Sequence, residues 1–260
     1  MATALITGGS SGIGLRFAHT LAASGYDLVL IARNPKELKS VAIKLTNQYG
    51  VKVRPLECDL SDRDGADQVV RLIPHIKNLE ILINNAGFGL HFDILDSSKN
   101  TRDAQAQAVN LMALNTMLFS SAAASAMVKR GVGHIINIGS TAAWTFQGNY
   151  SAIKIYVVSY TESLAIRLRD TGVTATVVCP AWMHTNFHKS AGLKEPSVPE
   201  WLYVTPEEVV EETLAAVSRG KSLIIPTRRW RLIIWLLTHG PVGLRRYITK
   251  KYMSSSNYKK

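Results

Sequence analysis

The sequence predicts an α/β fold, a doubly wound parallel sheet of about seven strands with helices on both faces. Short runs rich in Val, Ile and Leu alternate with longer stretches of helical periodicity, which is typical of successive βαβ units. The runs are almost continuously apolar, as expected for strands that are buried on both faces. The predicted strands cover residues 3–7, 27–32, 51–57, 81–84, 134–139, 174–179 and 222–225.

Length and composition favour one globular domain. The chain has 260 residues, of which 47% are hydrophobic and 19% charged, which excludes a disordered protein. Its two cysteines, Cys58 and Cys179, are too few for a disulfide scaffold or a Cys-rich zinc site. The seven histidines share no spacing, so no metal site is expected. Without a signal peptide or a run of ~20 apolar residues, a cytoplasmic location is expected.

A glycine-rich turn, Thr7–Gly14, directly follows the first predicted strand and opens a helix. Glycines permit a tight turn and close approach of a pyrophosphate, and the helix N-terminus offers free N–H groups and a positive dipole. Ordinary strand-to-helix loops can also be rich in glycine. The position between the first strand and a helix nevertheless favours a dinucleotide site, with contacts from Gly8, Ser10, Ser11, Gly12, Ile13 and Gly14.

The residue after the second predicted strand selects between two cofactors. Sites that prefer NAD usually place an acid there for the ribose 2′-hydroxyl. This chain has Arg33 instead, whose guanidinium suits a 2′-phosphate. The sequence therefore favours NADP(H). The alternative is that Arg33 is only a solvated residue at a helix start.

Tyr150 and Lys154 are spaced i and i+4, so they share one face of a helix. A free tyrosine titrates near ~10 and is a poor acid or base at neutral pH. A nearby ammonium stabilises the tyrosinate and lowers that pKa. The pair is thus a candidate acid/base group, although helices also carry such pairs as solvated side chains.

These motifs, together with Asn84–Gly87, occur in an order that resembles the short-chain dehydrogenase/reductase family in its single-domain, Rossmann-type form. The resemblance covers about residues 1–226. It implies that Tyr150 is the catalytic acid/base and that Lys154 lowers the pKa of Tyr150 and holds the nicotinamide ribose. It also implies that Ser140 hydrogen-bonds the substrate carbonyl and that Asn110 completes a water-linked proton relay. Further cofactor contacts implied by the resemblance are Asp59, Leu60, Asn85, Ala86, Gly87, Pro180 and Thr185.

The chain departs from the family pattern at two places. Nine residues separate Ser140 from Tyr150, fewer than is usual, and a rigid count back from Tyr150 would select Asn137. The Ser-Thr-Ala-Ala context favours Ser140, with a shortened loop at 144–149 and a wider substrate site. The second departure is Pro180-Ala181, where Pro-Gly is common. Neither change removes a catalytic side chain.

Residues 181–204 form an irregular segment after the sixth predicted strand, before a helix start at Thr205-Pro206. Ligands of doubly wound sheets bind where strands end at their carboxyl edge. We therefore interpret 181–204 as a substrate lid. Its apolar side chains suit an apolar substrate, although they could equally belong to the core: Trp182, Met183, Phe187 and Leu193.

The catalytic domain is expected over residues 1–227, and a basic amphipathic extension over 228–260. The extension holds nine Lys or Arg and no acid, whereas residues 1–227 hold 21 basic and 19 acidic residues. The nearly neutral body argues against a nucleic-acid partner, and a basic tail that binds nucleic acid is a third-ranked alternative. Trp230–Leu237 and the series Leu244, Ile248 and Tyr252 suit an anionic membrane surface. Alternatively, these helices cover the substrate pocket or pack on a second subunit of a homodimer or homotetramer.

Together these features predict an NADPH-dependent oxidoreductase that reduces a ketone to a secondary alcohol by hydride transfer. The substrate is expected to be apolar or long-chain, such as a 3-oxoacyl or lipid-like ketone. One alternative is a small-polyol or sugar dehydrogenase of the same family. Another is a non-catalytic NADP(H)-binding regulatory protein.

Overall fold

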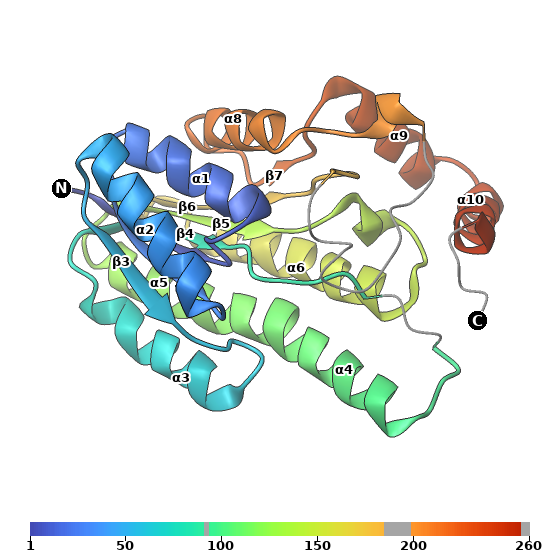
Figure 1. Ribbon diagram of the computed structural model, residues 1–260. Helices are drawn as coiled ribbons and strands as arrows, with labels where there is room; N and C mark the ends of the chain where they lie inside the picture. Colours follow the sequence, from blue (N-terminus) through green and yellow to red (C-terminus); the bar gives the residue numbers. More distant parts are fainter. Residues whose placement is uncertain (91–93, 185–198, 256–260) are drawn as a thin grey trace.

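The computed structural model describes residues 1–90, 94–184 and 199–255. Seven strands form one parallel sheet in the order β3-β2-β1-β4-β5-β6-β7 (Figure 1), so the predicted fold class is confirmed. The predicted strand ends differ from the observed ones by at most two residues. The strands are β1 (Thr3–Thr7), β2 (Asp27–Ala32), β3 (Val53–Glu57), β4 (Leu79–Asn84), β5 (Gly133–Ile138), β6 (Val173–Val178) and β7 (Leu223–Ile224).

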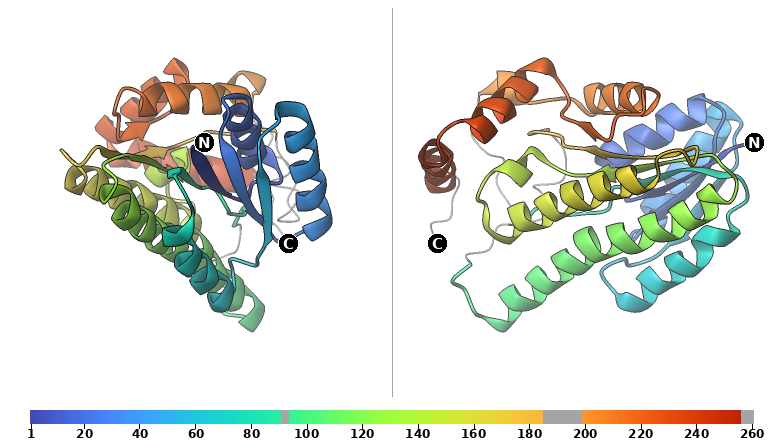
Figure 2. Two further views of the ribbon diagram at one scale, coloured as in Figure 1. Left: turned by 90° about the vertical axis from the view of Figure 1, so that its left-hand side faces the viewer. Right: turned by 180° about the vertical axis from the view of Figure 1, so that it is seen from behind.

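Helices cover both faces of the sheet (Figures 1 and 2). On one face lie α1 (Gly12–Ala23), α2 (Pro35–Tyr49) and α8 (Pro206–Val217). On the other lie α3 (Arg63–Leu72), α5 (Asn115–Val128) and α6 (Gly148–Arg167). The remaining helical elements are η1 (Ile73–His75), α4 (Lys99–Val109), the π turn η2 (Asn110–Leu114), η3 (Thr141–Trp144), η4 (Glu200–Leu202), α9 (Arg228–His239) and α10 (Val242–Ser255).

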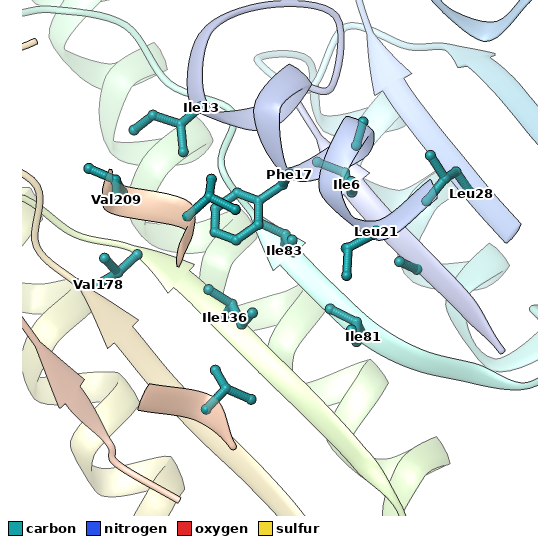
Figure 3. Packing of buried hydrophobic residues seen from close by; sticks show 14 of the residues in the cluster. Ile6, Ile13, Phe17, Leu21, Leu28, Ile81, Ile83, Ile136, Val178 and Val209 are labelled. Carbon is teal, nitrogen blue, oxygen red and sulfur yellow. The ribbon is translucent and has the colours of Figure 1, made fainter. Parts of the chain in front are cut away.

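Successive strand residues contribute to opposite halves of the core. Ile6 of β1 packs on the α1 side and Leu5 on the α5 side, and both are fully buried. Figure 3 shows Phe17 of α1 among Ile83 and Ile136 of the central strands. Burial on both faces is the reason that these strands read as continuous apolar runs.

The direction in which successive strands are added to the sheet reverses at β1, near its centre. The chain runs outward from β1 through β2 to β3 and then crosses to β4, on the other side of β1. A crevice forms at the carboxyl ends of β1 and β4 where the order reverses, which is where doubly wound sheets bind ligands. The N-terminus of α1 opens at this crevice.

The continuous helical stretch Lys99–Val128 is long and apolar enough, by length and composition, to cross a membrane. Half of its most apolar window is buried inside the protein. Phe119 and Met127, for example, pack against the sheet. Its apolar composition is therefore explained by its place in the core.

The predicted boundary at residue 227 is not a break in packing. Trp230 and Ile234 of α9 are buried in the same core cluster as Val209 and Val210 of α8. The beginning of the predicted extension is thus packed against the preceding domain.

Candidate active site

The turn between β1 and α1 has the geometry of a phosphate-binding turn. Gly8 and Gly12 have φ of +65° and +54°, values that disfavour other residues. A Cβ at Gly14 would lie 2.3 Å from the Gly8 carbonyl oxygen, whereas a Cβ at Gly12 would meet no atom within 4 Å. The α1 N-terminus also carries no acid in its first turn, and the Ser11 side chain does not cap it. Its N–H groups are therefore suited to an anionic ligand.

The segment after β4 is tied to this turn by hydrogen bonds. Backbone N–H groups of Asn85 and Ala86 donate to Thr7 Oγ1 at 2.9 and 3.0 Å. Asn85 Nδ2 donates to the carbonyl oxygens of Thr7 and Gly8 at 3.0 and 3.1 Å. The two loops that the sequence assigned to the cofactor are thus held as one unit.

Arg33 and Asp59 lie at the carboxyl ends of β2 and β3, beyond the cavity. Both are exposed. Partial burial opposes ionisation of Asp59, but two hydrogen bonds from Ser61 and the charge of Arg33 outweigh it and hold the pKa of Asp59 below its usual value. A guanidinium beside a carboxylate at this edge fits the adenosine end of a dinucleotide.

Tyr150 and Lys154 project from α6 next to the end of β5. Lys154 Nζ lies 5.6 Å from the centroid of the Tyr150 ring and donates to the Ile138 carbonyl oxygen at 2.9 Å. Ser140 caps η3 by accepting from Ala142 N at 3.1 Å. Acceptance of that bond leaves the Ser140 O–H available as a donor. Tyr150, Lys154 and Ser140 all line one cavity.

Lys154 is buried, with 6% of its surface exposed. Burial lowers its pKa from 10.5 to about 8, with a small opposing effect from Cys179. Burial likewise raises the pKa of Cys179 to about 12. The thiol therefore stays neutral beside a lysine that is still largely protonated at neutral pH.

The cavity has a volume of 510 Å³ and joins three regions. One end is the glycine-rich turn with Asn85, the middle holds Ser140, Tyr150 and Lys154, and the other end is apolar. The apolar lining consists of Trp182, Met183, Trp201, Leu202, Trp230, Ile233, Ile234, Leu237 and Ile248.

The described ends of the predicted lid are held together and against α9. Val204 N donates to the Trp182 carbonyl oxygen at 2.8 Å. The ring of Trp182 packs edge-on against that of Trp230 at 5.3 Å, and Trp230 Nε1 donates to the Leu202 carbonyl oxygen at 2.9 Å. Residues 185–198 of the lid, including Thr185, Phe187 and Leu193, lie outside the described residues, as does the Tyr252 side chain.

Among the residues that the structure describes, several of the predicted site residues do not line the cavity. Asn110 is exposed at the first position of the π turn. Ser10 and Leu60 are buried, and the Leu60 carbonyl oxygen accepts from Asn115 Nδ2 at 2.6 Å. Gly14 does not line the cavity, but its lack of a side chain lets α1 pack closely against Gly8. Those that do line the cavity are Gly8, Ser11, Gly12, Ile13, Asn85, Ala86, Gly87, Ser140, Tyr150, Lys154 and Pro180.

The choice between Ser140 and Asn137 is explained by burial. Asn137 is completely buried in β5 and bonds to Asn84, Ser120 and Thr161. It therefore belongs to a polar network within the core. Ser140 comes after the strand ends and faces the cavity.

Residues 2–196 match the family model described as short chain dehydrogenase. The chain belongs to this family. It is 29% identical over 234 residues to the 3-oxoacyl-acyl-carrier-protein reductase of Aquifex aeolicus, which covers 85% of this chain and 91% of the relative.

Two solved structures extend the comparison. A short-chain dehydrogenase of Sphingobium yanoikuyae in complex with NADPH has a TM-score of 0.82 and 28% identity, covering 100% of this chain and 98% of that one. The bulky-bulky ketone specific alcohol dehydrogenase of Comamonas testosteroni has a TM-score of 0.78 and 26% identity, with coverages of 94% and 93%. The protein is thus an oxidoreductase of the short-chain dehydrogenase family, whose members use nicotinamide cofactors.

Sequence reasoning did not anticipate the surroundings of the Lys154 ammonium in this short-chain dehydrogenase. The ammonium donates to the Ile138 carbonyl oxygen and interacts electrostatically with Cys179, and neither residue stands in a recognisable motif. The wall formed by α9 did have a signal, because Trp230, Ile233, Ile234 and Leu237 follow the i, i+3, i+4, i+7 spacing of one helix face. The sequence nevertheless left membrane contact, coverage of the pocket and contact with a second subunit as alternatives.

Proposed function

We propose that the protein is an NADPH-dependent carbonyl reductase that converts an apolar, bulky or long-chain ketone to a secondary alcohol. The observation that carries this proposal is the single cavity that connects Ser140, Tyr150 and Lys154 to an apolar wall. A ketone carbon held at the three polar side chains leaves its apolar substituents against tryptophan, leucine and isoleucine. A 3-oxoacyl chain and a bulky two-sided ketone both fit this description.

The preference for NADPH rests on the end of β2. Arg33 stands where an acid would recognise a ribose 2′-hydroxyl, and a guanidinium recognises a phosphate bidentately. The NADPH named for the Sphingobium structure is consistent with this choice. Residues that would hold the cofactor are the glycine-rich turn, Asn85 to Gly87, and the Arg33–Asp59 edge.

The three polar side chains have different tasks in the reduction. NADPH, when bound, supplies the hydride that adds to the carbonyl carbon. Ser140 Oγ donates to the carbonyl oxygen and orients it, and Tyr150 delivers a proton to that oxygen as it becomes an alcohol. Lys154, fixed by the Ile138 carbonyl, favours the tyrosinate that remains and holds the nicotinamide ribose.

The alternatives predict different behaviour. A small polyol or sugar needs several polar partners, whereas the wall beyond Tyr150 is mostly apolar. A non-catalytic cofactor-binding protein has no need for Ser140, Tyr150 and Lys154 around one cavity. A cytoplasmic setting and a homodimer or homotetramer built on the helices around residues 105–130 and 150–171 stay predictions.

The test is NADPH oxidation across a series of ketones of increasing chain length and bulk. We expect kcat/KM to rise with apolar size, and Tyr150→Phe to reduce kcat by about 10²- to 10⁴-fold while NADPH fluorescence still reports cofactor binding. Turnover confined to short polyhydroxy ketones would establish the sugar dehydrogenase instead. NADPH binding without turnover of any carbonyl in the wild type would favour the regulatory protein.

A further inference from the structure

Helix α9 is apolar on two opposite faces. Trp230, Ile233, Ile234 and Leu237 line the cavity. On the outer face, Leu232, Trp235 and Leu236 are 59%, 54% and 51% exposed. The inner face is explained by the substrate cavity. The outer face keeps large apolar side chains more than half exposed, although the Trp235 ring stacks on the His239 ring at 4.9 Å.

The exposed apolar surface continues onto α10. Leu244, Tyr247 and Ile248 are 48%, 63% and 41% exposed. A Cβ at Gly240, between the helices, would lie 2.6 Å from the Leu236 carbonyl oxygen and 3.9 Å from Leu244 Cδ2. Leu236 and Leu244 therefore lie on either side of the bend between α9 and α10. We call these six residues the outer surface of α9 and α10: Leu232, Trp235, Leu236, Leu244, Tyr247 and Ile248.

The mouth of the cavity lies beside this outer surface. Ile248 belongs to the outer surface and also lines the cavity. Trp201 lines the cavity as well and is 59% exposed. Figure 1 shows α9 and α10 at the end of the molecule that lies beyond the carboxyl ends of the strands. An apolar substrate that enters here passes the outer surface first.

The positive charge of residues 228–250 indicates which class of partner the outer surface would bind. Residues 228–250 contain six arginines or lysines and no acid. Arg229 donates to the Tyr203 carbonyl oxygen, Arg231 pairs with Glu212, and Arg245 lies over the Phe146 ring at 4.5 Å. Arg246 and Lys250 are exposed and, with Phe146 and Thr249, line a second hollow.

We propose that the outer surface of α9 and α10 docks on an anionic lipid bilayer, with Arg246 and Lys250 at the headgroups. Exposed tryptophan, tyrosine and leucine beside cations are the composition of an interfacial helix. A second copy of the chain is a poorer occupant, because it would bring the same cations against each other without an acid to neutralise them. The proposal extends the proposed function, since it opens the cavity mouth toward the bilayer that would contain an apolar ketone.

The experiment measures partition of the full-length protein onto vesicles by flotation. Phosphatidylcholine vesicles are compared with phosphatidylcholine–phosphatidylglycerol vesicles, at low and high salt. We expect binding to the anionic vesicles that weakens with salt and is accompanied by a blue shift of tryptophan emission that Trp235→Phe reduces. Tyr150→Phe should bind equally well, so a failure of binding is distinguishable from a failure of the proposed catalysis.

Two pairs of matched variants separate the apolar and charged contributions. Leu232→Gln with Leu236→Gln removes outer-surface apolar contact, and its control is Ile43→Gln with Ile166→Gln, which are 61% and 60% exposed on other helices. Arg246→Gln with Lys250→Gln removes two cations, and its control is Lys39→Gln with Lys44→Gln on α2. Because each cation near such a surface contributes about fivefold in partition, the double charge variant should lose about 25-fold.

The outcomes distinguish a lipid bilayer from a second copy of the chain and from other polyanions as the partner of the outer surface. Loss of vesicle binding in both the leucine variant and the charge variant, with binding kept in both controls, supports the proposal. No binding by the wild type, or binding that neither variant weakens, overturns it. A change from dimer to monomer in the leucine variant without vesicle binding assigns the surface to self-association, and binding to DNA that only the charge variant abolishes assigns it to polyanions. Both of these results also overturn the membrane proposal.

Discussion

The Lys154→Met variant should lack an increase of stability with rising pH that the burial of Lys154 gives to the wild type. Burial lowers the pKa of Lys154 from its ordinary value of 10.5 to about 8 in the folded protein. Because one pKa unit corresponds to about 1.36 kcal/mol, folding disfavours the protonated side chain by roughly 3 kcal/mol. Methionine keeps the length and apolar stem of the side chain without the proton.

The sign follows from proton binding. Between about pH 8 and 10.5 the unfolded chain holds more protons at this lysine than the folded protein, so the contribution of Lys154 to stability increases as pH rises. Between about pH 7 and 9, this increase is about 1 kcal/mol. The raised pKa of Cys179 acts in the opposite direction at higher pH, but the thiol is present in both proteins.

The assay is urea unfolding of the wild type and Lys154→Met without cofactor at both pH values. The wild-type free energy of unfolding should rise relative to that of the variant by about 1 kcal/mol between the two pH values. Equal pH slopes, or a wild type that loses stability relative to the variant, would refute the reasoning that burial governs the Lys154 proton. A parallel Lys44→Met variant, changed at an exposed position, controls for the loss of one positive charge.

Three further predictions concern other parts of the site. Arg33→Glu should raise KM for NADPH by about 10- to 100-fold with little effect on NADH, measured by steady-state kinetics, and an equal effect on both cofactors would contradict a 2′-phosphate contact. Asn110→Ala should change kcat by less than about twofold because Asn110 is exposed outside the cavity lining, and a large loss would restore its role in a proton relay. Trp230→Ala should reduce the free energy of unfolding by about 3–5 kcal/mol and lower turnover of bulky ketones, since Trp230 is 5% exposed between core and cavity. Unchanged stability would mean that α9 is not anchored as described.

Short sequence motifs predicted most of the cofactor-binding part of the site. The glycine-rich turn between an apolar run and a helix predicts a phosphate-binding turn, and the structure gives Gly8 and Gly12 the left-handed backbone that this turn needs. Tyr150 and Lys154 could be paired from their spacing because an α-helix places i and i+4 on one face. Ser140 needed its Ser-Thr-Ala-Ala context, since spacing alone pointed to Asn137.

The position of Asn110 illustrates a limit of motif matching. The motif order suggests a relay residue, but side-chain direction in a helix depends on its rotation. The π turn from Asn110 to Leu114 inserts extra backbone into the helix and shifts that rotation. Met112, not Asn110, packs against Gly87 and Ile153 in this structure.

The sequence by itself determined the fold class, the dinucleotide turn and the Tyr150–Lys154 pair, because each depends on contacts close along the chain or on simple periodicity. Tertiary structure alone decided which face of α9 meets the cavity, that the Lys154 ammonium is buried against the Ile138 carbonyl, and which apolar side chains stay exposed. These features join residues from separate strands and helices. Burial then sets the lysine pKa and divides α9 into two faces, and burial exists only once the whole chain has packed.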